Sequence, residues 1–175
     1  EDHPLPPLQF GNQTLSYNRL TNTDPAVITS QAFDLTGYTA ADLPTFYFNY
    51  RFNPFTNTAT VPFMTDDVEI RIFSNENANG RVIASNANLV ADDDLWLQFR
   101  EDIGDFAGDT GIQIEISYTP AAGVSTLNDG LFLDDLIIGF AERGETVFNA
   151  GENDDFVGFG SGSGEYQLEP RPAPP

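Results

Sequence analysis

The sequence has no cysteine and no lysine, and its only histidine is His3, in a proline-containing leader. Without cysteine, the chain forms no disulfide, no thiolate nucleophile and no cysteine-ligated metal site. Because the one imidazole lies in the leader, a Ser-His-Asp triad has no base in the body of the protein, and without lysine no Schiff base forms. These absences predict a protein that is not an enzyme, and glycoside hydrolysis by paired carboxylates stays as a minor alternative for which no strand carries a supporting motif.

Positive charge is also scarce. Twenty-seven acidic residues stand against seven arginines, for a formal net charge of −20. Phosphate contacts need a basic patch, so we expect no nucleic-acid partner and no attraction to an anionic membrane surface. The apolar runs are too short to span a bilayer, which predicts no membrane insertion. Cations are the natural partners of such a chain, or the acidity serves solubility.

What the sequence does contain is strand periodicity. The segments "PTFYFNYRF", "DVEIRIF" and "GIQIEISY" each alternate apolar with polar residues, which is typical of half-buried antiparallel strands. Further candidates are "AVITSQAFDL", "RVIASN", "LWLQFREDI", "LFLDDLIIGF" and "TVFNA", separated by turn-forming Gly, Asn and Asp. The spacing predicts an all-β sandwich of two antiparallel sheets.

The 175 residues suffice for one domain with a sizeable core. We divide them into an extended leader with a first strand (1–25), a β-sandwich core (26–150) and a Gly/Ser linker with a terminal strand and a proline-rich tail (151–175). Since the first residue is Glu1 and not Met, we expect a mature or excised segment.

The terminal strand is the alternating segment "EYQLE", and an isolated strand needs a sheet to join. Two arrangements are open. The strand closes its own sandwich, or it pairs with the edge of a neighbouring subunit by strand addition and so builds a head-to-tail fibre. The amino-terminal segment "PLPPLQF" could be donated in the same manner.

Two adjacent acids, Asp134 and Asp135, interrupt the apolar run "LFLDDLIIGF". Neighbours in a strand point to opposite faces, so one carboxylate is expected to face inward. A buried carboxylate needs compensation. Calcium, which takes six to eight oxygen ligands, provides it. The alternatives are a carboxylate that accepts backbone N–H bonds or one that pairs with an arginine.

Other acids gather in turns. These are Asp66 and Asp67, the triplet Asp92, Asp93 and Asp94, and the group Glu152, Asp154 and Asp155. Adjacent acids in turns usually form solvated edges that discourage wrong strand pairing. Of these groups, Asp92, Asp93 and Asp94 are the best further candidates for calcium ligands.

A ligand-binding face is a further possibility. If Leu95, Leu97 and Phe99 face the core, Trp96 faces outward with Arg100, and Tyr47 and Arg51 form a similar outward row. An aromatic side chain beside an arginine suits a sugar or a partner chain. Trp96, Tyr47, Arg51 and Arg100 are therefore the candidate ligand-binding residues. The alternative for Trp96 is a ring lying over the edge of the sandwich.

Three segments in order, "QAFDLTGYTAADLPTFYFNYRF", "LWLQFREDIGDFAGDTGIQIEISY" and "FLDDLIIGF", resemble MAM-like domains and calcium-containing carbohydrate-binding jelly rolls. With "GFAERGE" and the later "YQLE", the pattern is most similar to modules of very large bacterial surface proteins. The resemblance implies a jelly-roll β-sandwich with a structural calcium held by Asp134 and Asp135.

Together with the resemblance, these features predict a non-catalytic structural or adhesive module of a bacterial cell-surface or extracellular assembly. Its expected partners are other copies of itself or neighbouring surface modules. The alternative is a carbohydrate-binding module whose partner is a polysaccharide.

Overall fold

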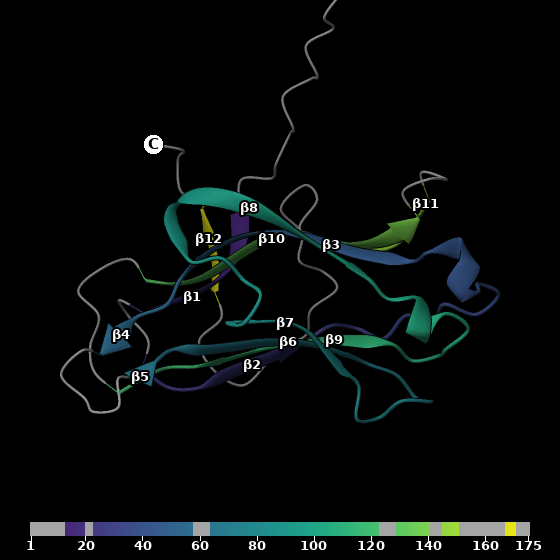
Figure 1. Ribbon diagram of the computed structural model, residues 1–175, viewed down its shortest axis with the longest axis horizontal. Coiled ribbons are helices and arrows are strands. Elements are labelled where there is room, and N and C mark those ends of the chain that lie inside the picture. Colours follow the sequence, from purple (N-terminus) through teal and green to yellow (C-terminus); the bar gives the residue numbers. More distant parts are fainter. Residues whose placement is uncertain are drawn as a thin grey trace, which may run out of the picture.

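The computed structural model describes residues 13–19, 23–57, 64–122, 129–140, 145–150 and 167–170. Two antiparallel sheets lie face to face, which confirms the predicted all-β sandwich (Figure 1). The elements are β1 (Gln13–Asn18), β2 (Ala26–Thr29), η1 (Ala40–Asp42), β3 (Thr45–Asn53), β4 (Thr56–Asn57), β5 (Met64–Thr65), β6 (Asp67–Phe73), β7 (Arg81–Ser85), β8 (Asp92–Asp102), η2 (Gly104–Phe106), β9 (Gln113–Thr119), β10 (Gly130–Phe140), β11 (Glu145–Ala150) and β12 (Gln167–Pro170).

Eight of these strands have the jelly-roll order. One sheet contains β1-β10-β3-β8, and the sheet that faces it contains β2-β9-β6-β7. The chain passes back and forth between the layers, which is the double Greek key of a jelly roll. The first sheet carries two additions: β12 extends its edge beyond β1, and β11 pairs with β10. Strands β4 and β5 form a separate two-stranded pair.

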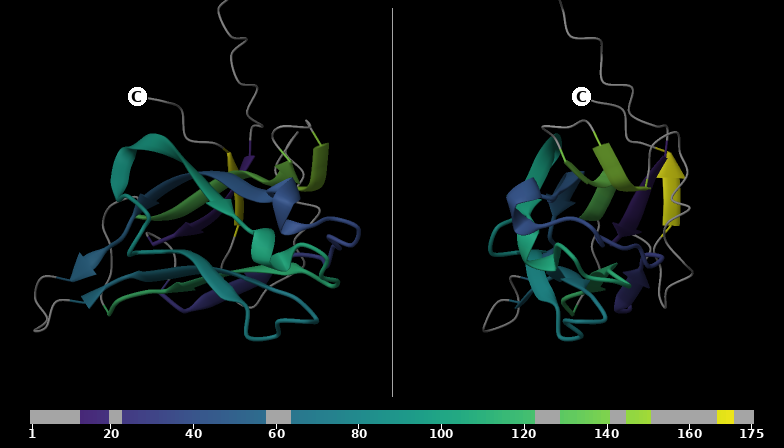
Figure 2. Two further views of the ribbon diagram at one scale, coloured as in Figure 1. Left: turned by 45° about the vertical axis from the view of Figure 1, so that its right-hand side comes forward. Right: turned by 90° about the vertical axis from the view of Figure 1, so that its right-hand side faces the viewer.

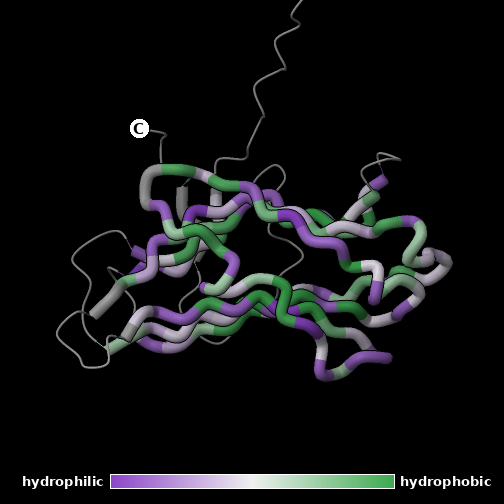
Figure 3. The backbone as a smooth tube through the Cα atoms, viewed as in Figure 1, coloured by the Kyte–Doolittle hydropathy of each residue, from purple (hydrophilic) through white to green (hydrophobic). Residues whose placement is uncertain are grey.

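The alternating sequence places one face of each strand in the core. In β3 the even-numbered residues 46–52 are buried, whereas Tyr47, Asn49 and Arg51 point outward and are half-buried, as predicted. In Figure 3 hydrophobic and hydrophilic residues alternate along the strands of both layers. The outward row of β3 therefore belongs to the outer face of the first sheet.

Strand β10 runs through the middle of this sheet and changes neighbours along one side. Residues 130–133 pair with β1, and residues 136–140 pair with β11, while the other side pairs with β3. A register shift between Asp134 and Ile137 marks a bulge, and Asp135 has a φ of 51°. The extra residue lets both Leu133 and Leu136 reach the core.

The predicted inward position of Leu95 is wrong. Leu97 and Phe99 pack against the core, but 53% of Leu95 is exposed. The cause is an irregularity between β3 and β8: Tyr50 lies opposite Leu97, yet Phe52 lies opposite Asp92. The strict period of two is lost over this part of β8.

Strand β12 lies beside β1 of its own chain, with residues 167–170 opposite residues 16–13 (Figure 2). Both β1 and β12 come from segments that flank the predicted core range of 26–150. The leader residues 1–12, the linker and the acids Glu152, Asp154 and Asp155 lie outside the described residues. In the described part, no helix has the length and apolar character needed to cross a bilayer.

Candidate functional site

The predicted calcium ligands lie at the bulge of β10. Asp134 lies opposite Asn49 in the register and is therefore on the outer face of the sheet, yet its side chain is completely buried. Asp135 follows in a left-handed backbone conformation and is half-buried. This position falls where β1 ends its pairing with β10 and β11 begins.

Hydrogen bonds hold the two carboxylates together. The backbone N–H of Asp135 donates to Asp134 Oδ1 at 3.0 Å. The side-chain amide of Asn49 donates to Asp135 Oδ2 at 2.8 Å. The bulge thus brings both acids next to Asn49, which differs from the strict alternation of faces expected of a regular strand.

A buried hydroxyl lies close to this pair in the sheet. Thr14 is completely buried, and within the described part of the chain its Oγ1 has no hydrogen-bond partner. It precedes Leu15, whose register partner Leu133 precedes Asp134. Burying a hydroxyl without a hydrogen-bond partner costs free energy. A cation bound by the Thr14 oxygen, or a ligand oxygen that accepts its proton, would remove this cost.

The donor chemistry fits calcium. The carboxylates of Asp134 and Asp135, the amide oxygen of Asn49 and the hydroxyl of Thr14 are all hard oxygen ligands. Among the described residues, no three acidic or histidine side chains gather closely enough to hold a metal ion by themselves. A calcium ion here would complete its shell with backbone carbonyls or water, and it stays a prediction.

The other predicted metal ligands are on a different strand. Asp92 opens β8, is half-buried, and accepts the backbone N–H of Leu95 at 3.0 Å, which ties the irregular part of the strand. Asp93 and Asp94 lie in β8, but their side chains are outside the described structure. Strand β3 separates β8 from β10, so the structure does not bring this triplet together with Asp134.

The candidate ligand-binding residues share the outer face with Asp134. The Arg100 guanidinium lies 5.3 Å from the centre of the Tyr47 ring, and that of Arg51 lies 4.3 Å from the Phe132 ring. Trp96 is half-buried on β8. The Tyr47 hydroxyl is buried and has no partner among the described residues. The face is aromatic, cationic and polar, a combination suited to stacking on a sugar or a partner chain.

One charged site was missed from the sequence. Asp66, expected at a solvated edge, is completely buried and lies 3.1 Å from Arg19, which is equally buried. The Tyr118 hydroxyl donates to the same carboxylate at 2.6 Å. Burial and this hydrogen bond raise the pKa of Tyr118 well above its usual range. The alternation of buried and exposed residues in β6 could have indicated this position. Asp66 lies two residues before the buried Val68 and therefore shares its inward face.

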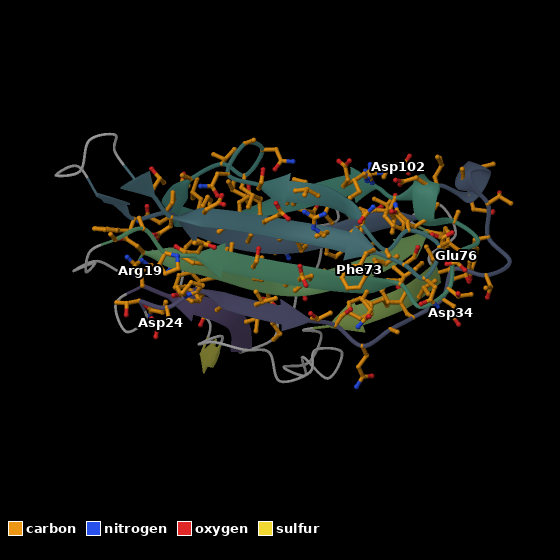
Figure 4. The ribbon with its side chains drawn as sticks, turned by 90° about the horizontal axis from the view of Figure 1, so that it is seen from below. Arg19, Asp24, Asp34, Phe73, Glu76 and Asp102 are labelled. Carbon is orange, nitrogen blue, oxygen red and sulfur yellow. The ribbon has the colours of Figure 1, made fainter. Side chains whose placement is uncertain are left out.

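Acids also tie the loops at the opposite end of the sandwich, where Figure 4 shows Asp34 and Glu76, far from Arg19. Asp34 accepts the backbone N–H of Gly111 at 2.8 Å, and Glu76 accepts that of Thr110 at 2.9 Å. The bonds from Thr110 lower the pKa of Glu76. Carboxylates here join separate loops by accepting their backbone donors.

Fold and site together define an acidic jelly-roll β-sandwich with a polar, partly buried outer face on one sheet. The sequence matches no protein-family model, and a search of curated proteins also finds no match.

Proposed function

We propose that this chain is a non-catalytic structural or adhesive module of a bacterial cell-surface or extracellular assembly, and that it joins neighbouring modules by strand addition. One observation carries the proposal. The last of the eight jelly-roll strands is β10. The later strand β12 is an additional short strand that pairs with the edge of β1. Once its own β12 is displaced, this edge offers the same backbone groups to the strand of a neighbour.

The use of the acidic residues supports a structural role. Many described carboxylates hold backbone N–H groups of loops and strand ends, as loop ties and not as a facing acid–base pair. They are Asp34, Asp42, Asp66, Asp92, Asp102, Glu76 and Asp134. A calcium ion at Asp134 and Asp135 would add one more such tie, between β10 and the strands beside it.

The outer face favours a second candidate, a carbohydrate-binding module. Tyr47 with Arg100, and Arg51 above the buried Phe132 ring, place two aromatic–guanidinium pairs on the outer face of one sheet, and Tyr47 is the accessible ring of the two. Retention on immobilised polysaccharides tests this function. A sugar binder should be a monomer, and Tyr47→Ala or Trp96→Ala should abolish its retention.

Size measurement by light scattering tests the proposed module. The full chain should form concentration-dependent oligomers, and Glu169→Pro, which removes an N–H opposite Thr14 of β1, should reduce them. The matched variant Glu169→Gln keeps the N–H and should assemble normally. A full chain that stays monomeric under all conditions, with and without calcium, contradicts the proposal.

A further inference from the structure

We infer that β12 is the strand exchanged between copies of this chain, and that the edge of β1 at residues 13–16 in a second copy receives it. The inference depends on the proposed assembly role and names the donor, the acceptor and the partner. It selects β12 over β1 as the donated strand, while the amino-terminal segment 4–10 lies outside the described residues.

Strand β1 is too firmly held to be donated. Tyr17 is completely buried and stacks on Tyr118 of the opposite sheet, with 4.1 Å between ring centroids. Two residues later, the Arg19 guanidinium is paired with Asp66 and donates to the carbonyl of Ala121 at 3.0 Å. Removing β1 would open the core and separate a buried ion pair. The strand therefore stays in its own sandwich and serves as an acceptor.

Strand β12, in contrast, is held to the sandwich by few backbone pairings. Among the described strands it pairs with β1 alone, through the four residue pairs from Gln13–Pro170 to Ser16–Gln167. Residues 151–166 separate it from β11, and an extended chain of that length reaches about 50 Å. The same register forms whether β12 comes from the same chain or from a neighbour, so local concentration decides between them.

The opposite edge of the same sheet, strand β8, is a poorer acceptor for an added strand. Strand β8 begins with Asp92, Asp93 and Asp94 and ends with Glu101 and Asp102. Charges on an exposed edge discourage pairing with another chain. Residues 13–16 of β1 read "QTLS" and carry no charge, and Thr14 and Ser16 are completely buried beside β12. The edge of β1 is thus already shaped for one added strand.

Charge sets the conditions for exchange. With a net charge of −20, two copies repel each other at low ionic strength. Salt screens this repulsion, so exchange between copies should increase with salt concentration. The second copy must supply the same backbone register, which any copy of this chain does by identity.

Because the chain has no cysteine, engineered thiols report the exchange without background. Paired residues of antiparallel strands have Cα atoms about 4.5–5.5 Å apart, within disulfide range. One chain carries only Ser16→Cys, and a second, mass-tagged chain carries only Gln167→Cys. The two are mixed at high concentration in about 0.5 M salt, which shortens the Debye length to a few ångströms. The mixture is warmed below the unfolding temperature, cooled, oxidised and analysed on a non-reducing gel.

The controls separate register from collision. Thr119→Cys, an exposed position on the opposite sheet, replaces Ser16→Cys to measure chance cross-linking. Gln13→Cys with Pro170→Cys repeats the test at the other end of the ladder, and Ser16→Cys with Pro170→Cys tests a wrong register. Circular dichroism and thermal unfolding check that each variant is folded.

We expect several-fold more heterodimer from the two in-register mixtures than from either control. The double variant Ser16→Cys/Gln167→Cys, oxidised in dilute solution, should close on itself and lose the ability to form oligomers until it is reduced. Heterodimer at the control level, while the parent chain still forms oligomers, overturns the exchange and leaves the assembly role to another surface. Heterodimer at the control level with no oligomers at all overturns both.

Discussion

Arg19 Nε lies 3.1 Å from Asp66 Oδ2, and neither side chain has any exposed surface. The pair joins the end of β1 in one sheet to the residue before β6 in the other. The hydroxyl of Tyr118 and the backbone N–H groups of Phe55 and Ala121 donate to the same carboxylate. A buried ion pair is tolerated when its remaining hydrogen-bonding capacity is satisfied in this way.

Replacing Asp66 with asparagine should therefore be strongly destabilising. The change leaves the Arg19 charge buried without its counterion, and we expect the free energy of unfolding to fall by about 3–5 kcal/mol. Asp67→Asn is the matched control, because Asp67 is exposed and surface changes usually alter stability by less than about 0.5 kcal/mol. Urea unfolding of both variants measures the difference, and equal effects would show that the pair does not hold the sheets together.

The same cluster predicts a dependence on alkaline pH. Burial, with the hydrogen bond to Asp66, raises the pKa of Tyr118 in the folded state, while in the unfolded chain this phenol ionises near pH 10. The folded protein then binds one more proton than the unfolded chain above about pH 10, so stability falls as pH rises there. Tyr118→Phe should be less stable at neutral pH but lose less stability between about pH 9 and about pH 11. Unfolding by urea at several pH values compares the slopes, and parallel slopes would contradict this.

The strands were predictable because their residues alternate over long stretches. In β6, Val68, Ile70 and Ile72 alternate with polar residues, and the observed strand has the predicted bounds. Burial on one face is a local property of the sequence, so no tertiary information was needed. The same phase would have placed Asp66 inside, had it been followed one step before the strand.

The bulge of β10 was not predictable in this way. Its extra residue depends on β10 changing neighbours from β1 to β11, strands that lie far apart in the sequence. The exposure of Leu95 has a similar origin, in the irregular pairing between β3 and β8. Both features come from tertiary pairing, which leaves no local period in the sequence.

The calcium prediction is tested by chelation. If calcium binds at Asp134 and Asp135, a chelator should lower the melting temperature. A calcium concentration of about 100 times Kd adds about 2.7 kcal/mol to the free energy of unfolding. For a chain of this size, that raises the melting temperature by roughly 5–10 °C. Asp134→Asn should lose this response, and Asp67→Asn should keep it. A melting temperature that is the same with calcium and with chelator would show that calcium does not stabilise this protein.

The backbone conformation of Asp135 restricts which residues fit at this position, in addition to any role of its carboxylate. Its φ of 51° is tolerated by asparagine and aspartate but not by β-branched residues. Asp135→Asn should be close to wild type in the absence of calcium, whereas Asp135→Val should cost about 1–2 kcal/mol from the backbone, in addition to the lost bond from Asn49. Denaturant unfolding in chelator compares the two variants. Equal stability would mean that the bulge relaxes to a regular strand.

Gly130 fixes how closely β1 approaches β10. It lies opposite Asn18 with a φ of 139°, and a Cβ at this position would come within 2.0 Å of the Tyr17 carbonyl oxygen. The backbone of β1 would have to move away, and with it Tyr17 from its place against the opposite sheet. Gly130→Ala should therefore lower the free energy of unfolding by about 1–3 kcal/mol from overpacking alone, with backbone strain in addition.

Gly37 provides the comparison for that variant. Its φ of 86° also disfavours a side chain, but a Cβ added there would meet no atom within 4 Å, so Gly37→Ala carries the backbone cost of about 1–2 kcal/mol without a collision. Since β12 pairs with β1, only Gly130→Ala should also weaken the hold on β12, which faster hydrogen exchange of the β12 amides would report. Equal loss of stability in the two variants, with β12 unaffected in both, would show that β1 can shift without disturbing the sheet.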